Sequence, residues 1–166
     1  MKRKLFCFLL AMIMMLAVVA CGENTPPDTD EEKDAVYVLE YQAKTLKIDD
    51  EAASILASFG TPQFYQELST CGKGDLDKLY QFGSVRIRTY QVDGCDYFSV
   101  IEIMDDLLKT KEGVTIGDTQ KSVEQAYGEA DEKTATAWIY HAKGMDLEFH
   151  FNESNAVKSI VYRGEN

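Results

Sequence analysis

The chain has 166 residues, and its 28 Asp and Glu residues outnumber its 17 Lys and Arg residues, for a formal net charge of −11. Hydrophobic residues make up 45% of the chain and aromatic residues 11%, which is typical of a globular protein rather than a disordered one. The first 20 residues hold three cations and no anion, so the remainder has 14 cations against 28 anions, a net charge of −14. This acidity argues against binding to nucleic acid and against binding to anionic lipid headgroups through a basic patch.

The N-terminus (residues 1–20) has the features of a secretory signal peptide. Lys2, Arg3 and Lys4 precede an unbroken apolar run that ends at Ala20. A helix over that run would span about 24 Å, which is short of the roughly 30 Å hydrocarbon core of a bilayer. The run leads into Val-Val-Ala-Cys, which resembles a bacterial lipobox, with a small residue before the thiol that accepts the lipid. The alternatives are an ordinary cleaved signal and a membrane anchor with an incidental cysteine.

From this N-terminus we predict lipidation of Cys21 and a stable anchor in a cell membrane, because two or more acyl chains bind a bilayer firmly. The protein would then lie on the extracytoplasmic face, with the outer surface of a Gram-positive type cell favoured. Residues 22–35 follow with six acidic residues, two prolines and no large apolar side chain. Such a segment buries too little surface to offset its ordering entropy, so residues 21–35 are predicted to be a disordered, lipidated acidic tether.

The remaining chain contains two similar segments. Residues 46–62 align without a gap on residues 114–130, at a constant offset of 68. In each segment an aspartate (Asp50 or Asp118) is placed to cap the first turn of a helix, and a glycine (Gly60 or Gly128) is placed to end it. Apolar residues recur between them at helical spacing, so the pattern predicts helices over about 50–59 and 118–127.

Strand-like segments follow each predicted helix, and residues 36–48 are expected to add a leading strand or hairpin. These segments are residues 79–82, 84–92 and 97–104 in the first half, and residues 137–141, 145–151 and 156–162 in the second. Asp93-Gly94 is a hairpin turn signal between two of them. The pattern predicts an α+β fold of two tandem helix-plus-antiparallel-sheet repeats in a two-layer domain. Repeat 1 covers residues 36–104, a polar linker covers 105–113, and repeat 2 covers 114–166.

The second segment also carries a family resemblance. Val114-Thr115-Ile116-Gly117-Asp118, then Val123 and Ala126-Tyr127-Gly128, resemble the repeat of the β-lactamase-inhibitor-protein-like fold and of the SmpA/OmlA-type envelope lipoproteins. Residues 36–166 also resemble uncharacterised lipoproteins of gut Firmicutes, which share the elements seen here at residues 59–62, 71, 77–80 and 110–113. Members of the fold bind proteins across the open face of the sheet, so the resemblance implies a protein-binding role. No partner-contacting residue of that fold can be matched onto this chain.

Two cysteines remain once Cys7 is removed with the signal and Cys21 is lipidated. Cys71 and Cys95 flank the first two strands of repeat 1, and a disulfide between them would close a 25-residue loop. In the chain-entropy model that bond would stabilise the fold by roughly 3–4 kcal/mol. A disulfide is favoured in an extracytoplasmic domain, and two free thiols are the alternative because many anaerobes lack a strongly oxidising surface.

Candidate contact residues lie on two of the predicted strands. Arg86, Arg88 and Tyr90 alternate along one strand, and Arg and Tyr are enriched among the anchors of protein interfaces. Glu148 and His150 alternate along another strand and are predicted to share this protein-contact face. Both are metal-ligand types, but a spacing of about 7 Å along a flat strand does not converge on one ion, so no metal is predicted. An ordinary solvated, ion-paired sheet face is the alternative.

Catalytic signatures are absent from the sequence. It has no phosphate-binding Gly-rich loop, no metalloprotease helix signature and no Gly-x-Ser-x-Gly elbow. We therefore predict a non-enzymatic, lipid-anchored envelope protein without a cofactor, whose sheet face binds an envelope or secreted protein, for assembly or for inhibition of a secreted enzyme. A small-molecule or glycan-binding lipoprotein associated with uptake is the alternative, although about 130 folded residues are few for a two-lobed receptor.

Overall fold

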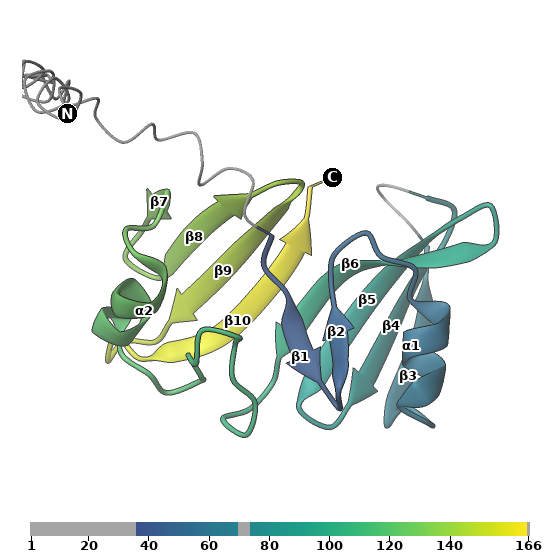
Figure 1. Cartoon of the computed structure of the whole chain (residues 1–166), viewed down its shortest axis with the longest axis horizontal. Helices are drawn as coiled ribbons and strands as arrows, with labels where there is room; N and C mark the ends of the chain where they lie inside the picture. The colour runs from purple at the N-terminus through teal and green to yellow at the C-terminus, as the bar shows by residue number, and fades with distance from the viewer. Residues whose placement is uncertain (1–35, 70–73, 166) are drawn as a thin grey trace, which may run out of the picture.

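The computed structural model describes residues 36–69 and 74–165, and these form ten strands and two helices (Figure 1). In chain order they are β1 (Leu39–Tyr41), β2 (Lys44–Leu46), α1 (Ala53–Ser58), β3 (Phe64–Leu68), β4 (Asp77–Phe82), β5 (Val85–Val92), β6 (Cys95–Ile103), α2 (Gln120–Tyr127), β7 (Glu132–Lys133), β8 (Ala137–Ala142), β9 (Met145–Phe151) and β10 (Val157–Gly164). Eight strands form one antiparallel sheet in the order β3-β4-β5-β6-β10-β9-β8-β7, and β1 pairs with β2 in a separate hairpin. No helix in these ranges is long and apolar enough to cross a membrane.

The predicted α+β fold of two helix-plus-sheet repeats is wrong. Strand accounts for 49% of the structure and helix for only 11%, so the protein is mostly β. Strands from both halves belong to one sheet because β6 pairs with β10, with Val100 opposite Arg163 and Ile103 opposite Ile160. The predicted signal peptide and tether, with Cys21, lie outside the described residues.

The two helices lie within their predicted ranges, but their N-terminal caps differ from the prediction. The side chain of Thr119 caps α2, whereas the Asp118 carboxylate accepts a hydrogen bond from the preceding turn. Helix α1 begins after Ala52 with no side-chain cap, so neither predicted aspartate cap is present. The predicted glycine stop is confirmed at α2, where Gly128 is the C-cap with a φ of 78°, a conformation that favours glycine.

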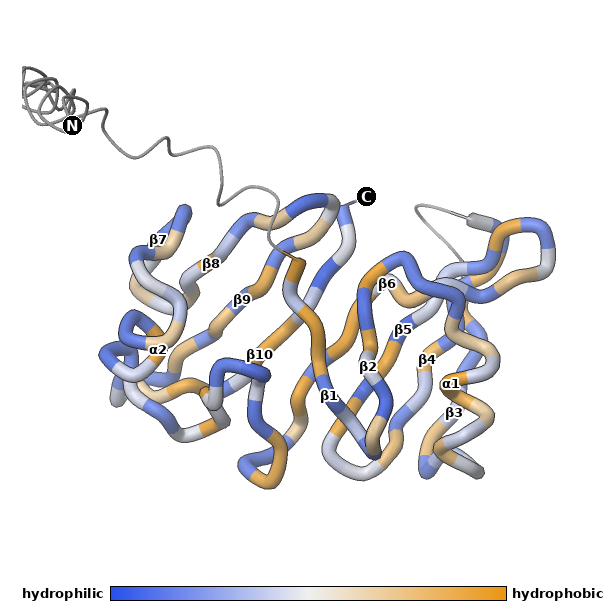
Figure 2. Tube along the Cα trace, in the orientation of Figure 1, coloured by the Kyte–Doolittle hydropathy of each residue, from blue (hydrophilic) through white to orange (hydrophobic). Residues whose placement is uncertain are grey.

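The sheet has a covered face and an open face. Helices α1 and α2 and the β1–β2 hairpin all lie on the covered face (Figure 1). Apolar side chains from every layer form the core there, and Figure 2 shows the apolar stretches along β1 and the central strands. The largest fully buried side chains include Leu39, Leu46, Phe98, Phe149 and Tyr162. The hairpin predicted within residues 36–48 is therefore confirmed, and it contributes Leu39 and Leu46 to the core.

The hydroxyl of Tyr162 is a weak point of this core. Tyr162 is 1% exposed, and within the described residues its hydroxyl has no hydrogen-bond partner. Because a buried, unsatisfied polar group costs about 1–3 kcal/mol, we expect Tyr162→Phe to raise the free energy of unfolding by about 1 kcal/mol. Urea denaturation followed by the fluorescence of Trp138, the one tryptophan of the chain, measures the change. A loss of stability would show that the hydroxyl is hydrogen-bonded in solution.

Candidate functional site

The open face of the sheet is the candidate site, because none of the described helices or strands covers it (Figure 1). Residues directly opposite one another on paired strands share a face, and so do alternate residues along a strand. The strand registers therefore define this open face. Its members on the central strands are Asp77, Leu79 and Gln81 on β4, Arg86, Arg88 and Tyr90 on β5, Tyr97, Val100 and Glu102 on β6, Ser159, Val161 and Arg163 on β10, Asp146, Glu148 and His150 on β9, and Ala137, Ile139 and His141 on β8.

Glu102 links three strands of the open face. Its Oε2 lies 3.2 Å from Nη1 of Arg86 on β5, and its Oε1 accepts a hydrogen bond of 3.1 Å from the hydroxyl of Ser159 on β10. The Arg86 and Glu102 side chains retain 41% and 27% of their exposure, so water screens this ion pair. Arg86 is therefore neutralised but still accessible at the surface.

Glu148 is the most buried charged group of the open face, at 9% exposure. Its Oε1 accepts a hydrogen bond of 2.5 Å from Nε of Arg163, and its Oε2 lies 2.8 Å from Nε2 of His150. Burial acts to raise the pKa of Glu148, but the hydrogen bonds with Arg163 and His150 outweigh it, so the pKa is lowered. The Glu148 carboxylate thus stays charged because His150 on β9 and Arg163 on β10 both hydrogen-bond to it.

His141 occupies the β8 end of the open face. Its Nδ1 lies 2.7 Å from Oδ1 of Asp146, and its Nε2 lies 3.4 Å from Oε1 of Glu132. The hydrogen bond to Asp146 raises the pKa of His141, and the negative charge of Asp131 raises it further. Both histidines of the chain are therefore hydrogen-bonded to carboxylates of the same face.

The five predicted contact residues all fall on the open face, but they differ in accessibility. Arg88 is exposed and Arg86 and His150 are half-buried, whereas Tyr90 is only 7% exposed and Glu148 only 9%. The Tyr90 hydroxyl donates a hydrogen bond of 2.7 Å to Asp49, and its ring stacks on Tyr97. Tyr90 and Glu148 therefore support the face from within, and of the five predicted contact residues only Arg86, Arg88 and His150 are accessible.

Arg88 differs from the other basic residues of the open face. Arg86, Arg163 and both histidines pair with carboxylates, whereas Arg88 has no ion-pair partner among residues 36–69 and 74–165. It lies directly between Leu79 on β4 and Val100 on β6, and Val100 in turn lies opposite Arg163. We call Leu79, Arg88, Val100 and Arg163 the arginine row. No local sequence pattern predicts Leu79, Val100 and Arg163 as part of the site, because only the register between strands brings them beside Arg88.

The cysteine prediction stays untested. Cys71 lies outside the described residues, and Cys95 is an exposed residue at the start of β6 with no disulfide partner in the part of the chain that the structure describes. Within that same part, no group of three or more His, Cys, Asp or Glu side chains is arranged to hold a metal ion.

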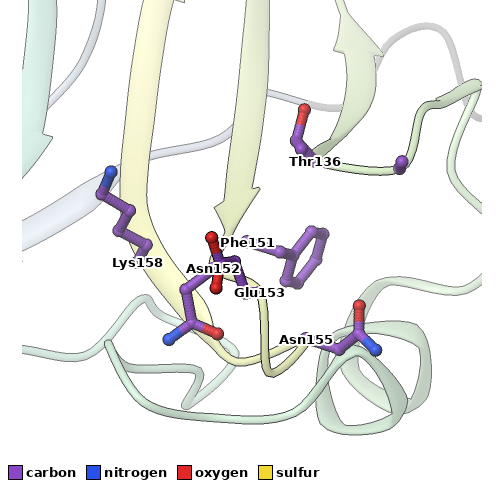
Figure 3. Close-up of a pocket in the computed structure, with 7 residues that line it drawn as sticks. Thr136, Phe151, Asn152, Glu153, Asn155 and Lys158 are labelled. Carbon is purple, nitrogen blue, oxygen red and sulfur yellow. The ribbon is translucent and has the colours of Figure 1, made fainter.

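A shallow hollow of about 390 Å³ lies at the end of β9, beside the turn into β10 (Figure 3). Its lining residues are Ala135, Thr136, Phe151, Asn152, Glu153, Asn155 and Lys158. The side-chain oxygen of Asn152 already accepts the backbone N–H groups of Ser154 and Ala156, so it holds the turn. The Phe151 ring is buried against Trp138 rather than exposed for stacking. Asn152 and Phe151 therefore serve the turn and the core rather than the hollow.

No family model, no curated protein and no solved structure matches this chain. The resemblance to the β-lactamase-inhibitor-protein-like fold and to envelope lipoproteins therefore stays a prediction from the sequence.

Proposed function

We propose that this chain is a non-catalytic, lipid-anchored envelope protein that binds another protein through the open face of its sheet. The observation that carries the proposal is the arginine row on a face that no described element covers. Arg88 is exposed there, has no ion pair with any residue that the structure describes, and is flanked by the aliphatic side chains of Leu79 and Val100. An arginine set among apolar neighbours is a frequent anchor of protein interfaces.

The arginine row also indicates the chemistry of the partner. The guanidinium group of Arg88 binds a carboxylate through two parallel hydrogen bonds, while Leu79 and Val100 accept apolar side chains on either side. The mature chain carries a net charge of −14, so most of its surface repels an acidic protein. The positive charge of Arg88 attracts a carboxylate of such a partner, and this contrast directs binding to the arginine row. A subunit of an envelope assembly and a secreted enzyme inhibited by this protein are two forms of such a partner.

The anchor in this proposal comes from the sequence at the N-terminus. Cys21 would carry the acyl chains, and residues 22–35 would hold the folded part away from the bilayer by roughly 20 Å as a flexible chain. A membrane position restricts the partner to proteins of the envelope or those released through it. Uptake of a small molecule or glycan is less well supported, since the hollow at β9 is shallow, its Asn152 side chain holds a turn and its Phe151 ring packs on Trp138.

Reversing the charge at the centre of the arginine row tests the proposal. The full chain with a C-terminal tag is expressed in its source cell, crosslinked, and captured for mass spectrometry. We expect one stoichiometric partner, and a loss of about tenfold in its recovery for Arg88→Glu, because the introduced carboxylate repels the partner's acidic group.

Lys44→Glu is the matched control, because Lys44 is an exposed cation on the hairpin of the opposite layer. The control should retain the partner. A partner that survives Arg88→Glu would place binding elsewhere on the protein, and capture of no partner from any growth condition would contradict stable protein binding.

A further inference from the structure

One edge of the eight-stranded sheet is unprotected. Among the strands that the structure describes, β3 is the terminal one and pairs only with β4, so within this part of the chain its outer backbone N–H and C=O groups are unpaired. Four of its five residues are exposed, and Phe64 and Tyr65 retain 46% and 47% of their surface. Among the described residues, no side chain or loop donates a hydrogen bond to the outer backbone of this strand. Exposed aromatic residues on an open edge are typical of a strand that pairs with another chain.

The opposite edge shows how the same sheet is protected. Strand β7 has only two residues, Glu132 and Lys133, and both are charged and exposed. Beyond β7 the edge passes to β8, where the Asp131 carboxylate accepts the backbone N–H of His141 at 2.8 Å. Shortness, charge and a capped N–H group are the usual means of blocking an edge, and β3 has none of them except the single charge of Glu67.

The sequence of β3 is complementary to itself in an antiparallel arrangement. With a two-fold axis through Gln66, Phe64 lies opposite Leu68 of the second copy, Tyr65 lies opposite Glu67, and Gln66 lies opposite Gln66. The two pairs of Phe64 with Leu68, one on each side of the axis, then lie on the same face of the sheet. The one charged residue of the strand meets a tyrosine hydroxyl instead of its own copy, and Tyr65 already donates a hydrogen bond of 2.6 Å to Glu67 within its own strand.

We propose that β3 pairs antiparallel with β3 of a second copy of this chain, forming a dimer with one continuous sheet. The pairing satisfies the outer backbone groups of β3 and buries Phe64 and Leu68 across the edge. A two-fold axis perpendicular to the sheet keeps both open faces on the same side. Because Gln66 lies opposite Leu79, the two arginine rows of the dimer lie end to end across the Gln66 pair. The dimer is independent of the proposed protein-binding function, since it uses the edge of the sheet and not the face.

A charge-swap experiment at Gln66 tests the dimer and its two-fold axis. In the proposed register Gln66→Lys places two lysines opposite each other and Gln66→Glu places two glutamates, so each variant alone should dimerise at least about fivefold more weakly than the unmodified chain. An equimolar mixture of the two variants should dimerise again, because lysine then faces glutamate. Sedimentation equilibrium of the full chain, purified from membranes in detergent, measures the dissociation constants.

The pair Gln125→Lys and Gln125→Glu is the matched control, because Gln125 is exposed on α2, which lies at the other end of the sheet from β3 (Figure 1). Both control variants should dimerise like the unmodified chain, and unchanged far-UV circular dichroism shows that all variants are folded. An unmodified chain that stays monomeric, or one whose dimer tolerates both Gln66 variants, would overturn the proposal. If each variant alone dimerises weakly and the mixture does too, Gln66 does not lie at the two-fold axis. That result would likewise refute this pairing.

Discussion

Phe149→Ala is expected to lower the free energy of unfolding by about 3–5 kcal/mol, the usual cost of removing a large aromatic side chain from a close-packed core. Phe149 lies on β9 with 0% exposure, between the sheet and α2. Its ring centroid is 5.1 Å from that of Tyr127 on α2 and 5.9 Å from that of Tyr140 on β8. The substitution therefore opens a cavity where the second helix attaches to the sheet, and urea denaturation followed by far-UV circular dichroism measures its cost.

Leu107→Ala is the control for this substitution, because Leu107 is 84% exposed and its loss should change stability by less than about 0.5 kcal/mol. A cost below about 1 kcal/mol for Phe149→Ala would contradict the expectation. Such a small cost would show that α2 and β8 move to fill the cavity, and therefore that the packing of the helix on the sheet is adaptable.

Glu148→Ala is expected to destabilise the protein by about 2–3 kcal/mol. The reason is that Arg163 and His150 share this one carboxylate, which is 9% exposed, and both would lose their acceptor. The side chains of Arg163 and His150 retain 43% and 41% exposure, so water partly replaces the lost bonds and keeps the cost below that of a fully buried pair. Glu102→Ala is the matched control, since its pair with the exposed Arg86 should contribute less than about 1 kcal/mol.

The same carboxylate predicts the direction of a pH effect. The pKa of Glu148 is lowered in the folded state, so its contribution is present above the ordinary pKa of a glutamate, about 4.3. That contribution is lost as the pH falls through the lower folded-state pKa. Comparing urea denaturation of the unmodified chain and Glu148→Gln at pH 7 and at pH 3 should show a stability difference that shrinks at the lower pH. An equal difference at both values would mean that the charge of Glu148 does not stabilise the fold.

Local patterns in the sequence predicted most individual elements. Alternation of apolar and polar residues predicted strands close to the bounds of β5, β6, β8 and β9, and the turn signal Asp93-Gly94 does connect β5 to β6. The two helices lie where helical spacing and a terminal glycine placed them. Strand β3 was missed, because Phe64–Leu68 has no alternation of apolar and polar residues, and β7 is too short to produce a pattern.

The candidate site was predicted only in part. Alternation with a period of two correctly places Arg86 and Arg88 on one face of β5. It does not predict that Tyr90, two positions further along, is buried against Asp49 and Tyr97. That burial depends on the segment before α1, which runs beside β6 with Glu51 opposite Tyr97. Leu79, Val100 and Arg163 join the site through cross-strand register, which is a property of strand pairs and not of any single strand.

The sequence by itself determined where most of the strands, turns and helices form, because those depend on periodicity and turn chemistry over a few residues. Only the tertiary structure decided that the two halves share one sheet. The deciding contacts pair Val100–Ile103 with Ile160–Arg163, about 60 residues apart, so no local pattern encodes them. The same pairing leaves one face open, sets the arginine row in line and leaves β3 at an edge. The surface proposed for binding is thus a consequence of long-range strand order, and of the arginine row only Arg88 was predicted from the sequence.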